Sequence, residues 1–221
     1  PRLFRLAPDR SIINRMGFNN DGLDAFADRL ARRPKGWVVG ANLGANKGAQ
    51  DRAAGYVTGL RRLSPLAEYL TANISSPNTP GLRALQGRAA LDDLLGRLAQ
   101  ARAPGGPPLF LKVAPDLDAA EMAMIVEAAL AHGVDALIVS NTTLDRPETL
   151  RSPFAGEAGG LSGAALKPKA RRALALAAQA AQGRLPLIAA GGIDSGAEAY
   201  ARIRAGASAV QSYSARAYEG P

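Results

Sequence analysis

The stretch that decides the fold is Asn73-Ile74-Ser75-Ser76-Pro77-Asn78-Thr79-Pro80-Gly81. It follows residues 69–72, a mainly apolar run that is typical of the end of a buried strand. This stretch places two amide and three hydroxyl side chains at the end of a core strand, and hydrophobic packing does not explain them well. Ser and Asn also favour ordinary turns, so a loop without a binding role is the alternative. We interpret the stretch as a polar loop at the mouth of a barrel, where it would hold a planar polar ligand.

On both sides of this loop the sequence alternates between strand and helix patterns. Residues 1–20 and 144–166 are expected to be irregular, and capping-box spacing starts two of the helices, at 118–121 and 195–198. The alternation, repeated six times, requires a parallel sheet covered by helices. Predicted strands lie within 37–43, 66–74, 109–113, 136–140, 185–190 and 209–211, and predicted helices lie at about 22–33, 50–63, 91–98, 118–132, 168–183 and 195–206.

Two α/β architectures fit such an alternation. A doubly wound sheet usually has its glycine-rich phosphate loop after the first strand, whereas the glycines here gather after the penultimate strand, at Gly191-Gly192. A (β/α)8 TIM barrel often builds its phosphate site after strands seven and eight. We therefore expect one domain over residues 1–221, an incomplete (β/α)8 TIM barrel. About six βα units are present, and we expect the first two strands and the last helix to be missing.

The composition excludes several kinds of site. Because the chain has no cysteine, it has no disulfide, no cysteine-ligated zinc or iron–sulfur cluster and no catalytic thiol. Its one histidine, His132, precedes Gly133 at a predicted helix end, so we expect a capping residue and no metal site. The net charge of +8 is dispersed over helix faces, so we expect no nucleic-acid partner.

Polar residues fall at the carboxyl ends of the predicted strands, which in a barrel converge on one mouth. Lys112 is the most informative, because it sits inside the apolar run 109–113, where an unpaired charge is costly. We expect it to bring positive charge to an electron-rich cofactor atom, and a lysine that snorkels at a strand end is the alternative. The set is Asn42, Asn73, Ser76, Asn78, Lys112, Ser140, Asn141, Thr142, Gly192 and Tyr213.

The last two strand ends favour a phosphate site. Gly191-Gly192 lies just before a helix capped at Ser195, where free backbone N–H groups can hold an anion. Tyr213-Ser214, after the last strand, would add further donors. Two adjacent loops of this kind predict a flavin or sugar phosphate.

At this point six motifs, taken in order, resemble those of dihydroorotate dehydrogenase. The resemblance runs from about Arg2 to Pro221 and is to the class 2, quinone-linked branch of bacterial type. The lack of cysteine separates the chain from class 1 enzymes, dihydropyrimidine dehydrogenases and tRNA-dihydrouridine synthases, which resemble it but use a catalytic cysteine. The motifs are NRMGFNN (14–20), NISSPNTPG (73–81), KVAPDL (112–117), SNTT (140–143), GGLSG (159–163) and GGIDS (191–195).

The resemblance implies an FMN-dependent oxidation of (S)-dihydroorotate to orotate in pyrimidine synthesis, with quinone as electron acceptor. It implies that Ser76 removes the C5 proton while the C6 hydride passes to N5 of FMN. The implied substrate-binding residues are Asn14, Arg15, Met16, Gly17, Phe18, Asn73, Asn78, Asn141 and Thr142. The implied FMN-binding residues are Asn42, Asn73, Lys112, Ser140, Gly163, Gly192, Tyr213 and Ser214.

The resemblance also sets expectations for the surroundings of the chain. It implies a monomer or weak oligomer, located in full length on the cytoplasmic side of the inner membrane. Contact with the membrane would be peripheral, through an N-terminal helical segment that this chain lacks. Without two barrel strands, we expect the chain alone to bind FMN weakly or not at all. The alternatives are another FMN barrel acting on a dihydropyrimidine or on dihydrouridine in RNA, and an inactive fragment.

Overall fold

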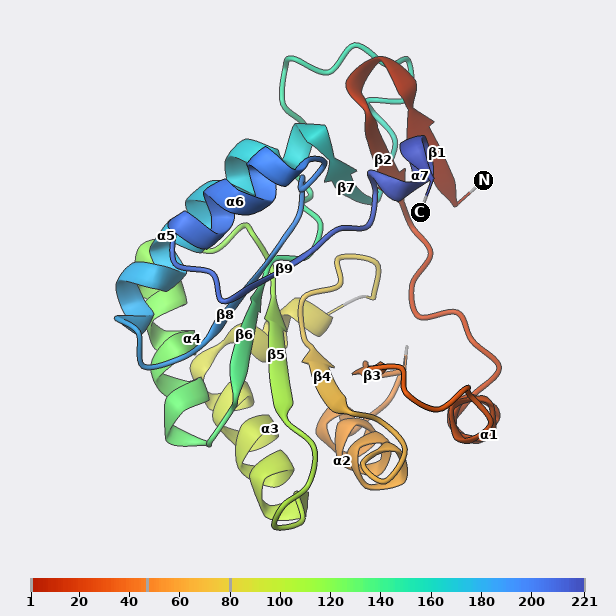
Figure 1. Cartoon of the computed structure of the whole chain (residues 1–221), viewed down its shortest axis with the longest axis vertical. Coiled ribbons are helices and arrows are strands. Elements are labelled where there is room, and N and C mark those ends of the chain that lie inside the picture. Colours follow the sequence, from red (N-terminus) through yellow and green to blue (C-terminus); the bar gives the residue numbers. More distant parts are fainter. Residues whose placement is uncertain (1, 47, 80, 221) are drawn as a thin grey trace.

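The structure, a computed structural model, describes residues 2–46, 48–79 and 81–220. Its main sheet contains six parallel strands whose spatial order equals their order in the sequence, and it curls into a half-barrel (Figure 1). No strand order reverses, as it would in a doubly wound sheet, so the fold is consistent with part of a TIM barrel. The strands are β3 (Gly40–Leu43), β4 (Tyr69–Asn73), β5 (Leu109–Val113), β6 (Ala136–Val139), β8 (Leu187–Ala190) and β9 (Ala209–Gln211).

Helices cover the outer side of this sheet (Figure 1). The predicted cap at Asp118 is confirmed, because Asp118 and Glu121 form a complete capping box. His132 is the C-terminal cap residue of the same helix, also as predicted. The helices are α1 (Leu23–Ala31), α2 (Arg52–Leu63), α3 (Arg88–Ala101), α4 (Ala119–Ala131), α5 (Lys167–Ala181), α6 (Gly196–Arg204) and the short α7 (Arg216–Glu219), with 3-10 turns η1 (Ala7–Asp9), η2 (Leu82–Gln86) and η3 (Ala164–Leu166). Within the described residues, none of these helices combines the length and apolar character needed to cross a bilayer.

The two faces of the sheet carry different side chains because neighbouring residues of a strand alternate. The outward side chains, such as Leu70, Leu111 and Leu137, join the helices in the main hydrophobic core. The inward side chains form a separate small cluster from β5, β6 and β8, which contains Ala136, Ile138, Ile188 and Ala190 with Phe110 packed against it. The inner face is therefore apolar at its base, and its polar residues lie at the carboxyl ends of the strands.

Three expectations from the sequence were wrong in detail. Residues 1–20 and 144–166 are not irregular, because they contain β1 (Leu3–Leu6), β2 (Ser11–Asn14) and β7 (Gly160–Gly163). These short strands form an antiparallel sheet in the order β1-β2-β7, with Ser11 opposite Gly163. It lies beyond the carboxyl ends of the parallel strands (Figure 1). Their four-residue length and the glycines at both ends of β7 hide the strand pattern.

The other two errors concern an element boundary and a cap. The strand predicted over 37–43 begins only at Gly40, and Trp37 and Val38 are 70% and 79% exposed. Ser195 caps α6, because its side chain accepts a hydrogen bond from the Glu198 N–H. The second hydrogen bond of a capping box is absent among the described residues, since the Glu198 carboxylate forms ion pairs with Arg171 and Arg202 instead. Of the turn predicted at 80–81, Gly81 has a φ of 69° and Pro80 lies outside the described residues.

Candidate functional site

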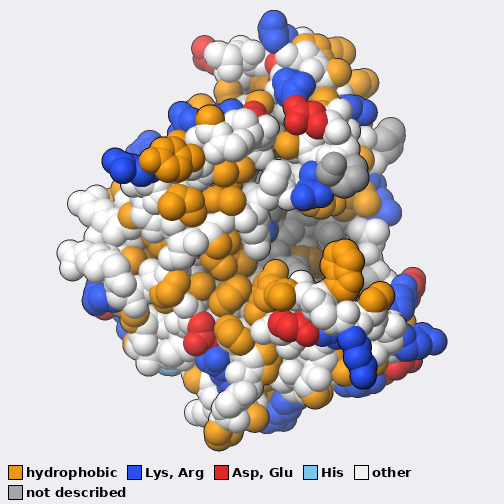
Figure 2. Space-filling model, in the orientation of Figure 1, with side chains coloured by type: hydrophobic (Ala, Val, Ile, Leu, Met, Phe, Trp, Pro, Cys, Tyr) orange, Lys and Arg blue, Asp and Glu red, His pale blue; other side chains and the backbone are white. Residues whose placement is uncertain are grey.

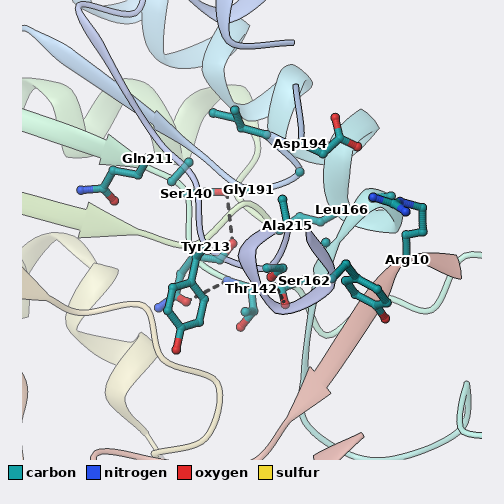
Figure 3. A pocket seen from close by; sticks show the side chains of 18 of the residues that line it. Arg10, Ser140, Thr142, Ser162, Leu166, Gly191, Asp194, Gln211, Tyr213 and Ala215 are labelled. Carbon is teal, nitrogen blue, oxygen red and sulfur yellow. Dashed lines mark hydrogen bonds between the residues drawn. The ribbon is translucent and has the colours of Figure 1, made fainter. Parts of the chain in front are cut away.

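A cavity lies where the ends of β5, β6, β8 and β9 face the small antiparallel sheet. It holds about 750 Å³ of space between atoms, part of it open to solvent. Figure 3 shows residues from the ends of these strands arranged around it, among them Ser140, Thr142, Gly191 and Tyr213. Eight of the predicted residues line it together: Lys112, Ser140, Asn141, Thr142, Gly163, Gly192, Tyr213 and Ser214.

Lys112 reaches the cavity from the inner face of β5. It pairs in register with Asn73 on β4 and with Ile138 on β6, so two strands flank it. Burial lowers the pKa of its ammonium group below the ordinary value of a lysine. Among the described residues no hydrogen bond or ion pair to its side chain is found, so the amine is free to meet a ligand. The side chain is only partly buried and lines the cavity, so the cofactor role of Lys112 stays a prediction.

Two glycines let the backbone approach the cavity closely. Gly192 has a φ of +71°, and a Cβ there would lie 2.7 Å from Lys167 Cα and 2.9 Å from Lys167 N. Gly163 has a φ of +89°, and a Cβ there would lie 2.6 Å from the Arg10 carbonyl oxygen. Any side chain would therefore push apart the segments that form this wall, which is the property expected of a backbone cradle for a phosphate.

A buried polar network connects the cavity to the loop after β4. The side-chain oxygen of Asn73 accepts from the Ser75 hydroxyl at 2.8 Å and from the Asn141 amide at 3.3 Å. The Asn141 amide also donates to the Ser75 hydroxyl at 3.0 Å. The Tyr56 hydroxyl donates to the Asn73 carbonyl oxygen at 2.6 Å, and burial raises the pKa of this tyrosine. Asn73 and Asn141 are thus held in fixed orientations beside each other.

Ser76 lies in the same loop and is only 7% exposed. Its hydroxyl oxygen accepts from the Asn78 N–H at 3.3 Å. The Asn78 amide in turn donates to the side-chain oxygen of Asn14, at the end of β2, at 3.0 Å. The structure therefore brings together three residues predicted to act on the substrate, although the loop and β2 are far apart in the sequence.

The remaining predicted residues do not line this cavity. Arg15 bonds to Glu157 at 2.8 Å and its guanidinium lies 4.6 Å from the centre of the Phe4 ring. The Met16 N–H lies 3.5 Å from the Asn14 side-chain oxygen. Gly17 has a φ of +69°, the Phe18 ring packs over Gly44, and Asn42 is exposed on the edge strand β3. Their predicted roles in binding stay predictions.

The cavity also has lining residues that were not predicted as site residues, although Ser162 and Asp194 lie within the motifs at 159–163 and 191–195. Additional lining residues are Arg10, Ser162, Asp194, Gln211 and Tyr218. Arg10 comes from the tight connection between β1 and β2, and Tyr218, on α7, donates to the Ser11 carbonyl oxygen at 2.6 Å. Arg10 could have been predicted to line the cavity only if residues 1–20 had been recognised in the sequence as a hairpin. No group of three or more His, Asp or Glu in the described residues could hold a metal ion.

The lining suits a ligand that has a flat polar ring system and an anionic end. The Lys112 amine, for which the described residues provide no partner, and the Asn141 amide line the cavity together with the glycine loops, Tyr213 and Ser214. Figure 2 shows that this face of the molecule is hollowed between the part that carries β1 and β2 and the part that carries α1. The donor set and the backbone cradle therefore fit a flavin nucleotide.

Comparisons with known proteins show the family to which the chain belongs. The family model described as dihydroorotate dehydrogenase matches residues 1–221. The chain is 58% identical to the dihydroorotate dehydrogenase (quinone) of Rhodospirillum rubrum and 57% identical to that of Erythrobacter litoralis, and all of it aligns with 61% and 64% of those proteins. A crystal structure of DHODH from Eimeria tenella in complex with ferulenol superposes with a TM-score of 0.94 at 40% identity, over all of this chain and 66% of that one. The chain therefore spans less than two thirds of these relatives, and it belongs to the dihydroorotate dehydrogenase family.

Proposed function

We propose that this chain forms the FMN- and dihydroorotate-binding part of a quinone-linked dihydroorotate dehydrogenase, which oxidises (S)-dihydroorotate to orotate for pyrimidine synthesis. The observation that carries the proposal is the convergence of eight predicted site residues on one cavity whose lysine has no partner among the described residues. Relatives that match the whole chain are named for this reaction.

The proposed binding roles of the residues follow from their positions. Lys112, Ser140, Gly163, Gly192, Tyr213 and Ser214 would hold FMN, with Asn42 and Asn73 beside its ring. FMN, when bound, supplies the acceptor for the hydride that leaves the substrate. Asn14, Asn78, Asn141 and Thr142 would orient the substrate ring and its carboxylate, with residues 15–18 completing that pocket.

Ser76 would take the proton from the substrate. Its hydroxyl is shielded from water and already accepts a hydrogen bond from the Asn78 N–H, which favours a developing negative charge on oxygen. A serine is a weak base at neutral pH, so its position must compensate for its pKa. The rigid network beneath the loop, from Asn73 through Ser75 to Asn141, would supply that position.

The test is Ser76→Ala in the flavin-loaded intact protein. General-base catalysis contributes roughly 10²–10⁴-fold, so reduction of the flavin by dihydroorotate should slow by that factor while dihydroorotate still binds. Stopped-flow absorbance of the flavin measures the rate, and titration of the flavin spectrum measures binding. Reduction at a rate near that of the unmodified protein would refute the role of Ser76.

The sheet also supports a proposal about the whole barrel. In the described residues β3 and β9 are edge strands, and Asn42 and Ala209 on them are exposed. The edge strands of an open sheet carry unpaired backbone N–H and C=O groups, which further strands can pair with. Two more strands would thus complete a (β/α)8 barrel of which residues 1–221 are one part. Tight, stoichiometric FMN in the isolated 221-residue chain would contradict this proposal.

The surroundings of the enzyme complete the proposal. Its partners would be dihydroorotate, orotate and a quinone, without nucleic acid, and it would act as a monomer or weak oligomer. It would sit peripherally at the cytoplasmic side of the inner membrane through a segment outside this chain.

A further inference from the structure

Arg83, on the 3-10 turn η2, contacts three loops that follow consecutive strands. Its Nε donates to the Ser75 carbonyl oxygen at 3.1 Å, after β4. Its Nη2 donates to the Thr142 carbonyl oxygen at 2.9 Å, after β6. Its Nη1 pairs with an Asp116 side-chain oxygen at 2.8 Å, after β5. One planar guanidinium thus joins the ends of β4, β5 and β6.

Asp116 fixes the guanidinium from the other side. Its second carboxylate oxygen accepts from the Thr143 hydroxyl and, at 3.1 Å, from the Lys169 ammonium group. The side chains of Arg83 and Asp116 are each 23% exposed, so water only partly screens the pair. Gln86, one turn after Arg83, adds a contact to the same region by accepting from the Ala114 N–H at 3.0 Å.

The two carbonyl groups that Arg83 holds belong to peptides next to site residues. Ser75 directly precedes Ser76, and Thr142 directly follows Asn141. The distance between the base and the amides that orient the substrate therefore depends on Arg83 together with the direct bonds from Asn141 to Asn73 and Ser75. Arg83 lines a second, separate pocket and not this cavity, and its donors are taken up by the two carbonyl groups and by Asp116, so its contact with the site runs through these loops.

We infer that Arg83, held by Asp116, is a positioning residue that sets the spacing between the Ser76 loop and the Asn141-Thr142 loop. The functional part of this inference rests on the proposed dihydroorotate oxidation. An arginine is needed because its rigid fork presents donors in three directions, whereas a lysine is a point charge that cannot hold both carbonyl groups and the carboxylate in one plane. A misplacement of about 1 Å can cost roughly 10²-fold in rate.

The first experiment measures the loops without reference to any reaction. Arg83→Lys keeps the positive charge. The matched control is Arg97→Lys, because Arg97 also donates two hydrogen bonds to one carboxylate, at 3.0 and 2.8 Å to the two Asp51 oxygens. Arg97 lies on the outer helix α3, away from the cavity. Hydrogen exchange in the intact protein should rise at least about tenfold in peptides covering 73–79 and 140–143 in Arg83→Lys, and not in Arg97→Lys. Unchanged exchange in both peptides would overturn the inference, whatever the protein catalyses.

The second experiment measures the consequence for the reaction. Flavin reduction by dihydroorotate, counted per bound flavin, should slow by about 10- to 100-fold in Arg83→Lys, with flavin content and melting temperature close to those of Arg97→Lys. A purely structural role would lower flavin content or melting temperature and leave the rate per bound flavin unchanged, which would overturn the inference. An unmodified protein that binds FMN but is not reduced by dihydroorotate would refute the proposed function alone, since the exchange experiment would still test the loops.

A second variant covers the case in which Arg83→Lys does not retain flavin. Asp116→Asn preserves the size of the side chain and removes the charge that orients the guanidinium. It should slow flavin reduction and raise exchange in the same two peptides. Normal rate and normal exchange in Asp116→Asn would show that the pair does not position these loops.

Discussion

Glu198→Gln should cost this protein a large part of its stability. Glu198 and Arg202 are 4% and 1% exposed, and the Arg202 Nε lies 2.7 Å from a Glu198 carboxylate oxygen. Arg202 also donates through Nη2 to the Gly191 carbonyl oxygen at 3.0 Å, and its Nη1 has no partner among the described residues. The glutamine variant therefore leaves a buried guanidinium without its counter-charge.

The magnitude follows from this burial. Breaking a buried ion pair by removing one partner costs about 3–5 kcal/mol, because the remaining charge stays desolvated. For a chain of 221 residues, at about 2–4 °C per kcal/mol, the melting temperature should fall by roughly 6–20 °C. The assay is thermal and urea unfolding of the flavin-free intact protein, so that ligand binding does not mask the loss.

Two further variants separate the buried pair from its exposed partner. Arg171 also bonds to Glu198, with Nε at 3.0 Å, but its side chain is 54% exposed, so Arg171→Ala should destabilise far less than Glu198→Gln. The double variant Glu198→Leu, Arg202→Met replaces the pair by apolar groups and should recover most of the stability. A loss below about 1 kcal/mol in Glu198→Gln, or a double variant no more stable than the single one, would refute the reasoning.

The same pair predicts a pH dependence. Burial raises the pKa of Glu198, but the hydrogen bonds from Arg171 and Arg202 outweigh burial and hold the pKa below its ordinary value. The folded protein thus binds this proton less readily than the unfolded chain does. The contribution of Glu198 to stability should be present above about pH 4.3 and be lost as the pH falls further. Unfolding from pH 7 to pH 3 should therefore show a steeper loss in the unmodified protein than in Glu198→Gln.

Two other substitutions test the cavity. Lys112→Met should weaken flavin binding. It should also stabilise the flavin-free protein at pH 7, because burial lowers the pKa of Lys112 and so disfavours its charged form in the folded state. This gain in stability should shrink as the pH rises toward about 10.4, where the lysine of the unfolded chain also loses its proton. Urea unfolding at pH 7 and pH 10, with the exposed Lys35→Met as control, measures this, and a flavin-free Lys112→Met protein less stable at pH 7 would contradict it. Gly192→Ala should lower flavin affinity by roughly tenfold or more, equal to about 1.4 kcal/mol, because a Cβ would meet Lys167. Gly183→Ala is its control, with a similar φ of +76° but no atom within 4 Å of the added Cβ, so fluorescence titration should find flavin affinity lost only at Gly192.

The sequence predicted the parts of the fold that depend on local patterns. Parallel strands and their covering helices were recognisable because long apolar runs end at polar residues or glycine. Lys112 could be predicted to line the cavity because a charge inside an apolar strand is costly unless it meets a partner or a ligand. The grouping of Gly163, Gly192 and Tyr213 around one cavity followed from the barrel and the family resemblance together.

Other parts depend on partners that are distant in the sequence. β7 is a strand because it pairs with β2, which also pairs with β1, and none of these four-residue segments has a strong pattern of its own. Arg83 carries no signal in composition or spacing, since its importance comes from two carbonyl groups and a carboxylate on other loops. Glu198 had the right spacing for a capping box, but two arginines compete for its carboxylate.

The pairing of Ser11 with Gly163 determines when the cavity can form during synthesis of the chain. The cavity combines Arg10 near the start of the chain with Tyr213, Ser214 and Tyr218 near the end of the described residues. A ribosome releases these segments at very different times, and closing a loop of this length delays folding. The binding site can therefore assemble only after nearly all of these residues have emerged. The proposed flavin loading would then follow the synthesis of both segments.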